Sequence, residues 1–124
     1  MNIPANLQYS KDHEWVLMNA DGTATVGITD YAQDALGDIV YVELPALGPV
    51  DAGAQVSSVE SVKAVSDILC PVSGEITEVN TELESAPEKL NADPYGTWIF
   101  KLTGPATGEL MDATAYERFL AQEG

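Results

Sequence analysis

Short segments that alternate apolar and polar side chains, each ended by a turn residue, set the strongest limit on how this chain folds. Ten glycines and seven prolines interrupt the 124 residues. Alternation over a few residues between such turn signals is typical of strands that bury one face in a sheet. Many short strands with a single helix at the carboxyl end indicate a mainly β fold, a sandwich or barrel with helices at its periphery.

The positions of the turn residues divide the chain into the strands and helices that we expect. We expect strands over residues 13–18, 23–28, 38–44, 55–61, 65–70, 75–79 and 97–102. We expect helices over 30–37, over 80–89 and near the carboxyl end, where Thr114 and Glu117 have the spacing of a capping box. Residues 45–53 hold two prolines and two glycines and are expected to form a loop. Because no linker or low-complexity segment interrupts the pattern, we expect one domain over residues 1–124.

The charge of the chain excludes several classes of partner. Twenty acidic residues against five basic ones give a formal net charge of −15. Nucleic acids and anionic membrane surfaces attract basic proteins, so neither is an expected partner. The apolar runs are too short to span a bilayer, and the first residues resemble neither a signal peptide nor a transit segment. We therefore expect a cytoplasmic protein, although a processed mitochondrial chain would have the same features.

Single copies of cysteine and histidine limit the chemistry further. With only Cys70 and His13, the chain has no disulfide framework, no multi-cysteine metal site and no paired-histidine zinc signature. We expect Cys70 to be a small buried residue and His13 to end the first strand. Trp15 and Trp98 lie in apolar segments and are expected in the core. A group of acids in the expected second helix is predicted to form a solvated face: Glu82, Glu84 and Glu88.

Lys63 is the only lysine or arginine between Lys11 and Lys89, and it lies at the expected turn between two strands. Three uses fit that position: an ordinary surface lysine, a nucleophile that forms a Schiff base, or an attachment point for a prosthetic group. A Schiff-base lysine reacts as the neutral amine, whereas the neighbouring Glu60 and Asp67 favour the charged ammonium. The acids therefore argue against a catalytic site made of Lys63, Glu60 and Asp67.

The residues around Lys63 resemble the lipoylation motif of the glycine cleavage system H-protein family. The motif here is Glu60-Ser61-Val62-Lys63-Ala64, followed by Asp67. Further blocks match the family in the same order, at residues 13–15, 26–30, 36–40, 42–45, 71–75, 78–80 and 91–96. One block alone is a weak signal, whereas so many blocks in register, covering essentially the whole chain, are a strong one. The interpretation as an ordinary surface lysine is then strongly disfavoured.

The resemblance implies the lipoyl/biotinyl-type fold, a hybrid of barrel and sandwich, and a carrier that is not itself an enzyme. Lys63 would be joined by an amide to lipoic acid. The arm would receive an aminomethyl group from glycine decarboxylase, a pyridoxal-phosphate enzyme, and pass it to an aminomethyltransferase that uses tetrahydrofolate. Dihydrolipoyl dehydrogenase would reoxidise the reduced arm, and separate enzymes would attach the lipoyl group. Tethering raises the local concentration of the carried group. We expect the carrier to be a monomer.

The resemblance also implies a cleft that shelters the loaded arm, whose terminal amine is cationic at neutral pH. Glu14 and Asp67 are the matching carboxylates, and each is equally consistent with an ordinary solvated acid. Tyr31 and Ala35 stand where family members often have histidine, which removes any histidine contact with the arm from these positions. Family members usually have a glycine immediately before the tryptophan that corresponds to Trp98. This sequence lacks that glycine, so the loop before Trp98 is expected to be one residue shorter.

Other carriers fit less well, and one alternative stays open. An acyl carrier protein is small and acidic, but it is helical and modified at a serine in Asp-Ser-Leu, a tripeptide that this sequence lacks. A biotin carrier sets its lysine between methionines, whereas Lys63 lies between Val62 and Ala64. An H-like protein that donates or relays its lipoyl group, or serves another redox pathway, remains the alternative to a glycine cleavage carrier.

Overall fold

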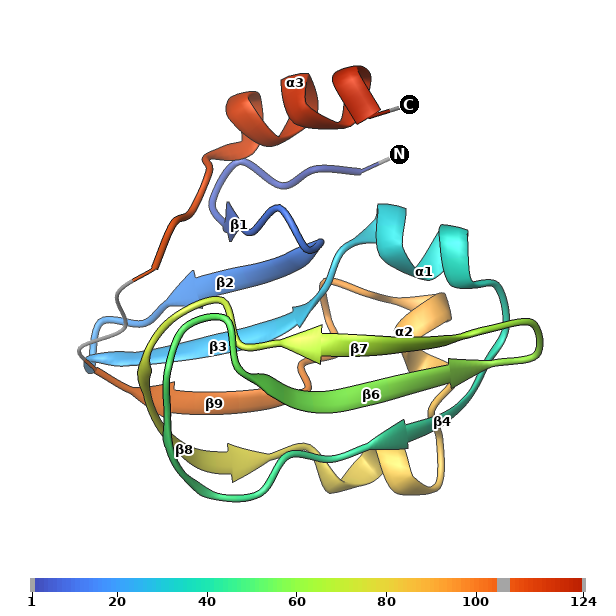
Figure 1. The fold of residues 1–124 in the computed structure, drawn as a ribbon, viewed down its shortest axis with the longest axis horizontal. Helices are drawn as coiled ribbons and strands as arrows, with labels where there is room; N and C mark the ends of the chain where they lie inside the picture. The colour runs from blue at the N-terminus through green and yellow to red at the C-terminus, as the bar shows by residue number, and fades with distance from the viewer. Residues whose placement is uncertain (1, 105–107, 124) are drawn as a thin grey trace.

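Two antiparallel sheets form the body of the protein in the computed structural model, which describes residues 2–104 and 108–123 (Figure 1). The larger sheet has the order β1 (Gln8–Tyr9), β2 (Glu14–Met18), β3 (Thr23–Ile28), β9 (Phe100–Thr103), β8 (Gly74–Val79) and β5 (Gly48–Val50). The smaller sheet has the order β4 (Ile39–Glu43), β6 (Gln55–Ser61) and β7 (Val65–Leu69). The helical segments are α1 (Asp30–Leu36), the 3-10 turn η1 (Thr81–Glu84), α2 (Lys89–Ala92) and α3 (Ala113–Glu123).

The main core lies between the two sheets, and both contribute apolar side chains to it. Val16, Val26 and Phe100 of the larger sheet are buried together with Val59 and Ile68 of the smaller one. Burial of such side chains is the dominant favourable term in folding. The mainly β fold with peripheral helices that the sequence predicts is confirmed. Figure 1 shows β6 and β7 in front of the larger sheet, as a hairpin whose tip projects beyond α1.

Two strands were not predicted from the sequence, because each is too short for its pattern to be recognised. β1 has two residues and β5 has three, and β5 lies inside the stretch 45–53 that was expected to be a loop. The loop prediction is wrong there because β5 is an edge strand. At the edge, Pro49 is tolerated although it has no N–H to donate to a neighbouring strand.

The segment from Asn80 to Phe100 also differs from its prediction. The expected helix over 80–89 is wrong as a single element, since η1 and α2 are separated by residues 85–88, which include Pro87. The expected strand over 97–102 begins only at Phe100, as β9. Before it, the Thr97 hydroxyl donates to the carbonyl of Lys89, and the carbonyl of Trp98 accepts from the Asn80 side chain. Thr97 and Trp98 are therefore held by these loop contacts rather than by pairing with a neighbouring strand.

A second apolar cluster holds α3 against the start of the chain. Leu7, Tyr9, Trp15 and Tyr116 are buried in it, and the rings of Tyr9 and Tyr116 stack with their centroids 4.7 Å apart. Figure 1 shows α3 beside β1 and the amino-terminal segment. The expectation that Trp15 is a core residue is confirmed, whereas Trp98 is only partly buried at the border of this cluster.

Candidate functional site

The turn that carries Lys63 is held by its neighbour Ser61. The Ser61 N–H donates to the carbonyl of Ala64 (2.8 Å), and its hydroxyl oxygen accepts from the N–H groups of Ala64 (3.1 Å) and Lys63 (3.3 Å). Serine side chains stabilise tight turns through such bonds to the nearby backbone. Ser61 is buried, so water competes little for these bonds. The tip of the β6–β7 hairpin is therefore a defined support, with Lys63 exposed on it.

The hairpin tip rests on the corner where α1 ends and β4 begins. The N–H of Val62 donates to the carbonyl of Asp38 at 3.0 Å. Gly37, which caps α1, has a φ of 79°, a left-handed conformation that favours glycine. A Cβ atom added to Gly37 would lie 3.3 Å from Cε of Lys63, so the lysine stem lies against bare backbone. The partial negative charge at the carboxyl end of a helix favours a cation in this position.

Asn91 of α2 fixes the same corner with its side-chain amide. Its Oδ1 accepts from the N–H of Ile39 (2.8 Å), and its Nδ2 donates to the carbonyl of Gly37 (2.8 Å) and to Oε1 of Gln33 (3.0 Å). An asparagine amide can do this because it carries both donors and an acceptor. Sequence reasoning did not assign this role to Asn91. The available signal was its position at the start of the matching block 91–96.

Glu60 and Asp67, the acids of the motif around Lys63, are both exposed on the strands of the hairpin. Glu60 lies opposite Val65, and Asp67 accepts a hydrogen bond from Nε2 of Gln55 at 3.0 Å. Within residues 2–104 and 108–123, neither acid forms an ion pair with Lys63. The structure therefore does not bring these three side chains together as a hydrogen-bonded catalytic cluster.

Glu14, the other acid expected in a cleft, is buried rather than solvated. Only 1% of its surface is exposed. Its Oε1 accepts a hydrogen bond of 2.6 Å from the Ser10 hydroxyl, while Oε2 has no hydrogen-bond partner among the described residues. Burial raises the pKa of Glu14 to about 8, because the charged form loses its hydration. The interpretation of Glu14 as a solvated strand-end acid is wrong.

The carboxyl group of Glu14 lies near the end of β7 that is opposite to the hairpin tip. Burial has the largest effect on the pKa of Glu14 and raises it, while the nearby backbone of Leu69 lowers it by a smaller amount. Burial raises the pKa of the Cys70 thiol to about 11, and the nearby Glu14 adds to this rise. The Cys70 Sγ donates to the carbonyl of Val72, which confirms Cys70 as a small buried residue. Among the described side chains, no hydrogen bond joins Glu14 to Asp67.

His13, next to Glu14, has a structural role. It has a φ of 68°, which bends the chain immediately before β2. Its Nδ1 lies 2.9 Å from the hydroxyl of Tyr116, which is also 2.9 Å from Oγ1 of Thr29. The ring of Tyr31 packs on His13, with centroids 4.5 Å apart. Tyr31 of α1 therefore packs against His13, whereas Ala35 is an exposed residue of the same helix.

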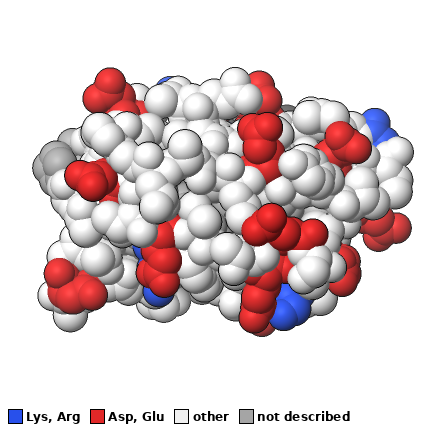
Figure 2. Space-filling model, turned by 90° about the horizontal axis from the view of Figure 1, so that it is seen from below, with Lys and Arg blue, Asp and Glu red and all other residues white. Residues whose placement is uncertain are grey.

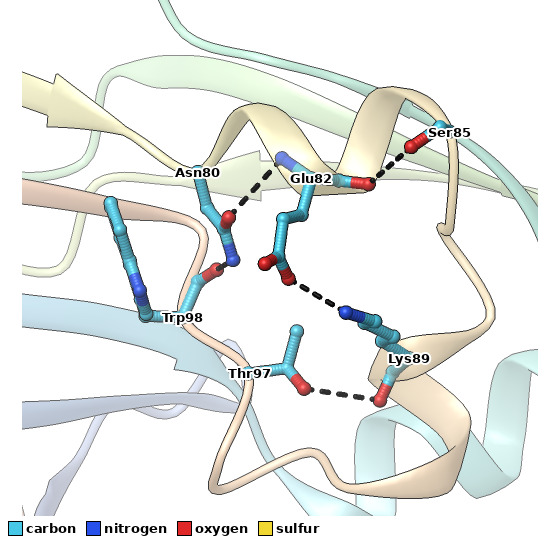
Figure 3. Close-up of polar contacts among 6 residues, drawn as sticks. All are labelled: Asn80, Glu82, Ser85, Lys89, Thr97 and Trp98. Atoms are coloured by element: carbon cyan, nitrogen blue, oxygen red, sulfur yellow. Dashed lines mark hydrogen bonds and ion pairs between the residues drawn. The ribbon is translucent and has the colours of Figure 1, made fainter.

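The acidic residues after Asn80 form a solvated surface with one ion pair. Glu82, Glu84 and Glu88 are exposed, as expected. Figure 3 shows Glu82 of η1 facing Lys89 of α2, with 2.7 Å between the carboxylate oxygen and Nζ. Exposed pairs of this kind contribute little stability, since both groups are well hydrated. The ring of Trp98 lies 4.8 Å from Nζ of Lys101, so its outer face is partly covered by a cation.

The described surface offers few other sites. Figure 2 shows acidic side chains distributed over one face of the molecule, with few basic ones between them. Within the described ranges, no group of three or more histidine, cysteine or acidic side chains could hold a metal ion. None of the described helices is long and apolar enough to cross a membrane. Lys63 on its hairpin and the buried Glu14 are therefore the features that need a functional explanation.

Comparisons with known proteins agree over nearly the whole chain. The family model described as glycine cleavage H-protein matches residues 7–123. The glycine cleavage system H protein of Burkholderia ambifaria is 54% identical over 123 residues, covering 96% of this chain and 98% of the relative. The one from Escherichia coli O7:K1 is 55% identical over 127 residues, covering 98% of each chain. The crystal structure of a glycine cleavage system H protein from Mycobacterium marinum superposes with a TM-score of 0.87 at 43% identity, covering 98% of this chain and 99% of that one.

Proposed function

The chain belongs to the glycine cleavage H-protein family, and from that membership we propose that Lys63 carries a lipoyl group, bound as an amide to Nζ. The protein is a lipoyl carrier of the glycine cleavage system. The observation that supports Lys63 as the attachment point is its place in the family's motif, exposed at the tip of a hairpin that Ser61 holds. A carrier needs this combination, because the attaching enzyme must reach the amine while the support stays fixed.

The residues near Lys63 suit an attached group. Within the described ranges the ammonium has no ion pair to give up, so converting it to a neutral amide sacrifices only its contact with the end of α1. The bare backbone of Gly37 leaves room beside the stem, where a side chain would be in contact with Cε. When bound, the lipoyl group supplies a dithiolane that accepts and releases an aminomethyl unit and is reduced in the process. The chain itself supplies attachment, orientation and shelter.

We assign Glu14 and Asp67 to the shelter of a cationic cargo. The unpaired Oε2 of Glu14 is a buried acceptor that an ammonium could satisfy. With a pKa of about 8, Glu14 is mostly protonated at neutral pH, and an approaching cation favours its ionised form. Asp67 is an exposed carboxylate on β7, the strand that leads from the hairpin tip toward Glu14. Glu14→Ala and Asp67→Ala should therefore accelerate loss of the aminomethyl group, and unchanged release rates would reject this assignment.

The partners we propose are glycine decarboxylase, an aminomethyltransferase, dihydrolipoyl dehydrogenase and the enzymes that attach the lipoyl group. The net charge of −15 suggests that they bind through basic surfaces. The carrier then contributes a high local concentration of the arm rather than a catalytic group.

The proposal is tested by mass spectrometry and by reconstitution. Protein made with lipoate available should carry one lipoyl group, located on Lys63 by peptide mapping. Lys63→Arg should carry none and should support no turnover with the three partner enzymes. Lys89→Arg, a second exposed lysine, is the matched control and should behave as the unaltered protein. A lipoyl group on another residue, or full turnover with Lys63→Arg, would contradict the proposal.

A further inference from the structure

Ser10, which follows β1, is bonded to Glu14, the first residue of β2, through both backbone and side chain. The Ser10 N–H donates to the Glu14 carbonyl (2.9 Å), and the Glu14 N–H donates to the Ser10 hydroxyl oxygen (3.1 Å). The hydroxyl in turn donates to Oε1 of Glu14 at 2.6 Å. Both residues are buried, with 4% and 1% of their surfaces exposed, so water competes little for these bonds. Ser10 therefore fixes the direction of the Glu14 carboxyl group.

The Ser10 hydroxyl has a fixed donor direction. A hydroxyl group has one hydrogen to donate and two lone pairs that can accept. In Ser10, the N–H groups of Glu14 (3.1 Å) and Asp12 (3.3 Å) occupy both lone pairs. Its single hydrogen therefore points to Oε1 whether or not Glu14 is ionised. Ser10 can donate a hydrogen bond to the Glu14 carboxyl group, but it cannot accept one from it.

This saturation decides which oxygen of Glu14 carries the proton when the carboxyl group is neutral. A proton on Oε1 that pointed to Ser10 would meet the hydroxyl hydrogen and no free lone pair. Oε2 is buried and has no hydrogen-bond partner among the described residues. The neutral group therefore places its proton on Oε2, and Oε1 is the carbonyl oxygen that accepts from Ser10. Oε2 is also the oxygen that stays open to a further partner.

Ser10 is itself held in place by the residue before it. Tyr9 is fully buried, its N–H donates to the carbonyl of Met111 (2.8 Å), and its carbonyl accepts from the N–H of Met111 (2.7 Å). The ring of Tyr9 stacks on that of Tyr116 in α3. A donor fixed in this way does not have to reorganise when charge develops on its acceptor. The Ser10 hydroxyl is therefore preorganised for an ionised Glu14.

Of the described side chains next to the carboxyl group, only that of Ser10 favours its ionised form. Burial has the largest effect on the pKa of Glu14 and raises it, the Ser10 hydrogen bond lowers it, and the charge of Asp12 raises it. The Cys70 thiol has a pKa of about 11, so it stays neutral at neutral pH. Ile28, opposite Glu14 on β3, is apolar. Removing the Ser10 hydroxyl would therefore remove the side-chain support of the carboxylate.

We propose that Ser10 positions Glu14 for the cargo by holding Oε1, which leaves Oε2 as the one oxygen that carries a proton and meets the amine of the cargo; this inference rests on the proposed function. When the cargo presents a neutral amine, the proton on Oε2 passes to its nitrogen, so a carboxylate and an ammonium are left in contact. The negative charge is shared with Oε1, where the Ser10 hydroxyl stabilises it through a charge-assisted hydrogen bond. Ser10 is a positioning residue, because its hydroxyl acts through Glu14.

The first test uses the protein without a lipoyl group and follows the Glu14 carboxyl carbon by carbon-13 NMR in a pH titration. Ser10→Ala should raise the titration midpoint of Glu14 by about one pH unit, since it removes one hydrogen bond to the charged form. In infrared difference spectra against Glu14→Gln, the carbonyl band of the neutral acid should move to higher wavenumber, because Oε1 loses its donor. Ser10→Thr keeps the hydroxyl and should restore both signals.

Ser57→Ala is the matched control for the loss of a buried serine hydroxyl. Ser57 is also buried, but its hydroxyl donates to the carbonyl of Glu43 rather than to an acid. This variant should lose stability and leave both signals of Glu14 unchanged. A midpoint and a carbonyl band that stay in place in Ser10→Ala would overturn the proposal. Equal shifts in Ser57→Ala, or no recovery in Ser10→Thr, would overturn it as well.

The second test measures loss of the aminomethyl group from the loaded arm at neutral pH. One pH unit in the midpoint is a tenfold change in the ionised fraction, so Ser10→Ala should lose the group up to about tenfold faster. Ser10→Thr should retain it like the unaltered protein, and an unchanged rate in Ser10→Ala would refute the role of Ser10 toward the cargo. Failure of the proposed function is distinct: the unaltered protein would carry no lipoyl group on Lys63, or Glu14→Ala would not change the release rate, whatever the carbon-13 titration shows.

Discussion

Glu14→Gln should stabilise the protein at neutral pH, and the size of the gain should depend on pH. Glutamine has nearly the shape of the protonated carboxyl group, so it keeps the contact with Ser10 and removes the ionisable group. Folding raises the pKa of Glu14 from 4.5 to about 8. The contribution of Glu14 to stability is therefore fully present below pH 4.5, the pKa in the unfolded chain. It is lost as the pH rises from there to the pKa in the folded protein, about 8.

The magnitude follows from the two pKa values. Each pH unit between them costs the folded state about 1.4 kcal/mol, because only the unfolded chain ionises Glu14 there. Relative to the unaltered protein, Glu14→Gln should gain about 1 kcal/mol in free energy of unfolding at pH 5 and about 3 kcal/mol at pH 7. Above pH 8 the gain should level off.

Urea denaturation of both proteins from pH 5 to pH 9 measures this difference. Glu75→Gln, at an exposed position, is the control and should show no comparable slope. A stability difference for Glu14→Gln that is flat across this range would refute the reasoning, since it would mean that the buried carboxyl titrates normally. The stabilised variant should also be the poorer carrier, because a neutral amide cannot pair with a cationic cargo.

Three further predictions address the corner, the carboxyl-terminal helix and the partners. Gly37→Ala should lower the free energy of unfolding by about 1–2 kcal/mol, because alanine is strained in the left-handed backbone conformation of this position. The loss should exceed that of Gly22→Ala, since Gly22 also has a left-handed backbone (φ of 89°) but has open space around it. Equal losses in urea denaturation would show that the contact with Lys63 is unimportant. Tyr116→Phe removes the hydroxyl that contacts His13 and Thr29, and should lower the free energy of unfolding by about 1 kcal/mol. An unchanged melting temperature would show that these hydrogen bonds do not stabilise the fold. Binding to glycine decarboxylase should weaken as salt rises, and salt-independent affinity in calorimetry would count against charge-guided docking.

Sequence reasoning located the elements whose signals are local. The β6–β7 hairpin and the exposure of Lys63 at its turn follow from strand patterns within one short segment. The bonds of Ser61 that hold this turn are known only from the structure. The sequence does not predict the burial of Glu14, because that burial involves β7, which lies more than fifty positions away. The contact between Gly37 and Lys63 is equally non-local, and no periodicity reports it. The structure was needed wherever two distant segments meet.

The length of β7 sets the distance between Lys63 and the buried Glu14. Lys63 stands at one end of it, and the carboxyl group of Glu14 lies beside Leu69 at the other. The six backbone steps from position 63 to position 69 span at most roughly 20 Å, whereas a lysine stem extends only roughly 6 Å from Cα. Under the proposed function, a group attached to Lys63 must therefore extend well beyond the lysine stem, along the direction of β7, before the buried acid can shelter its far end.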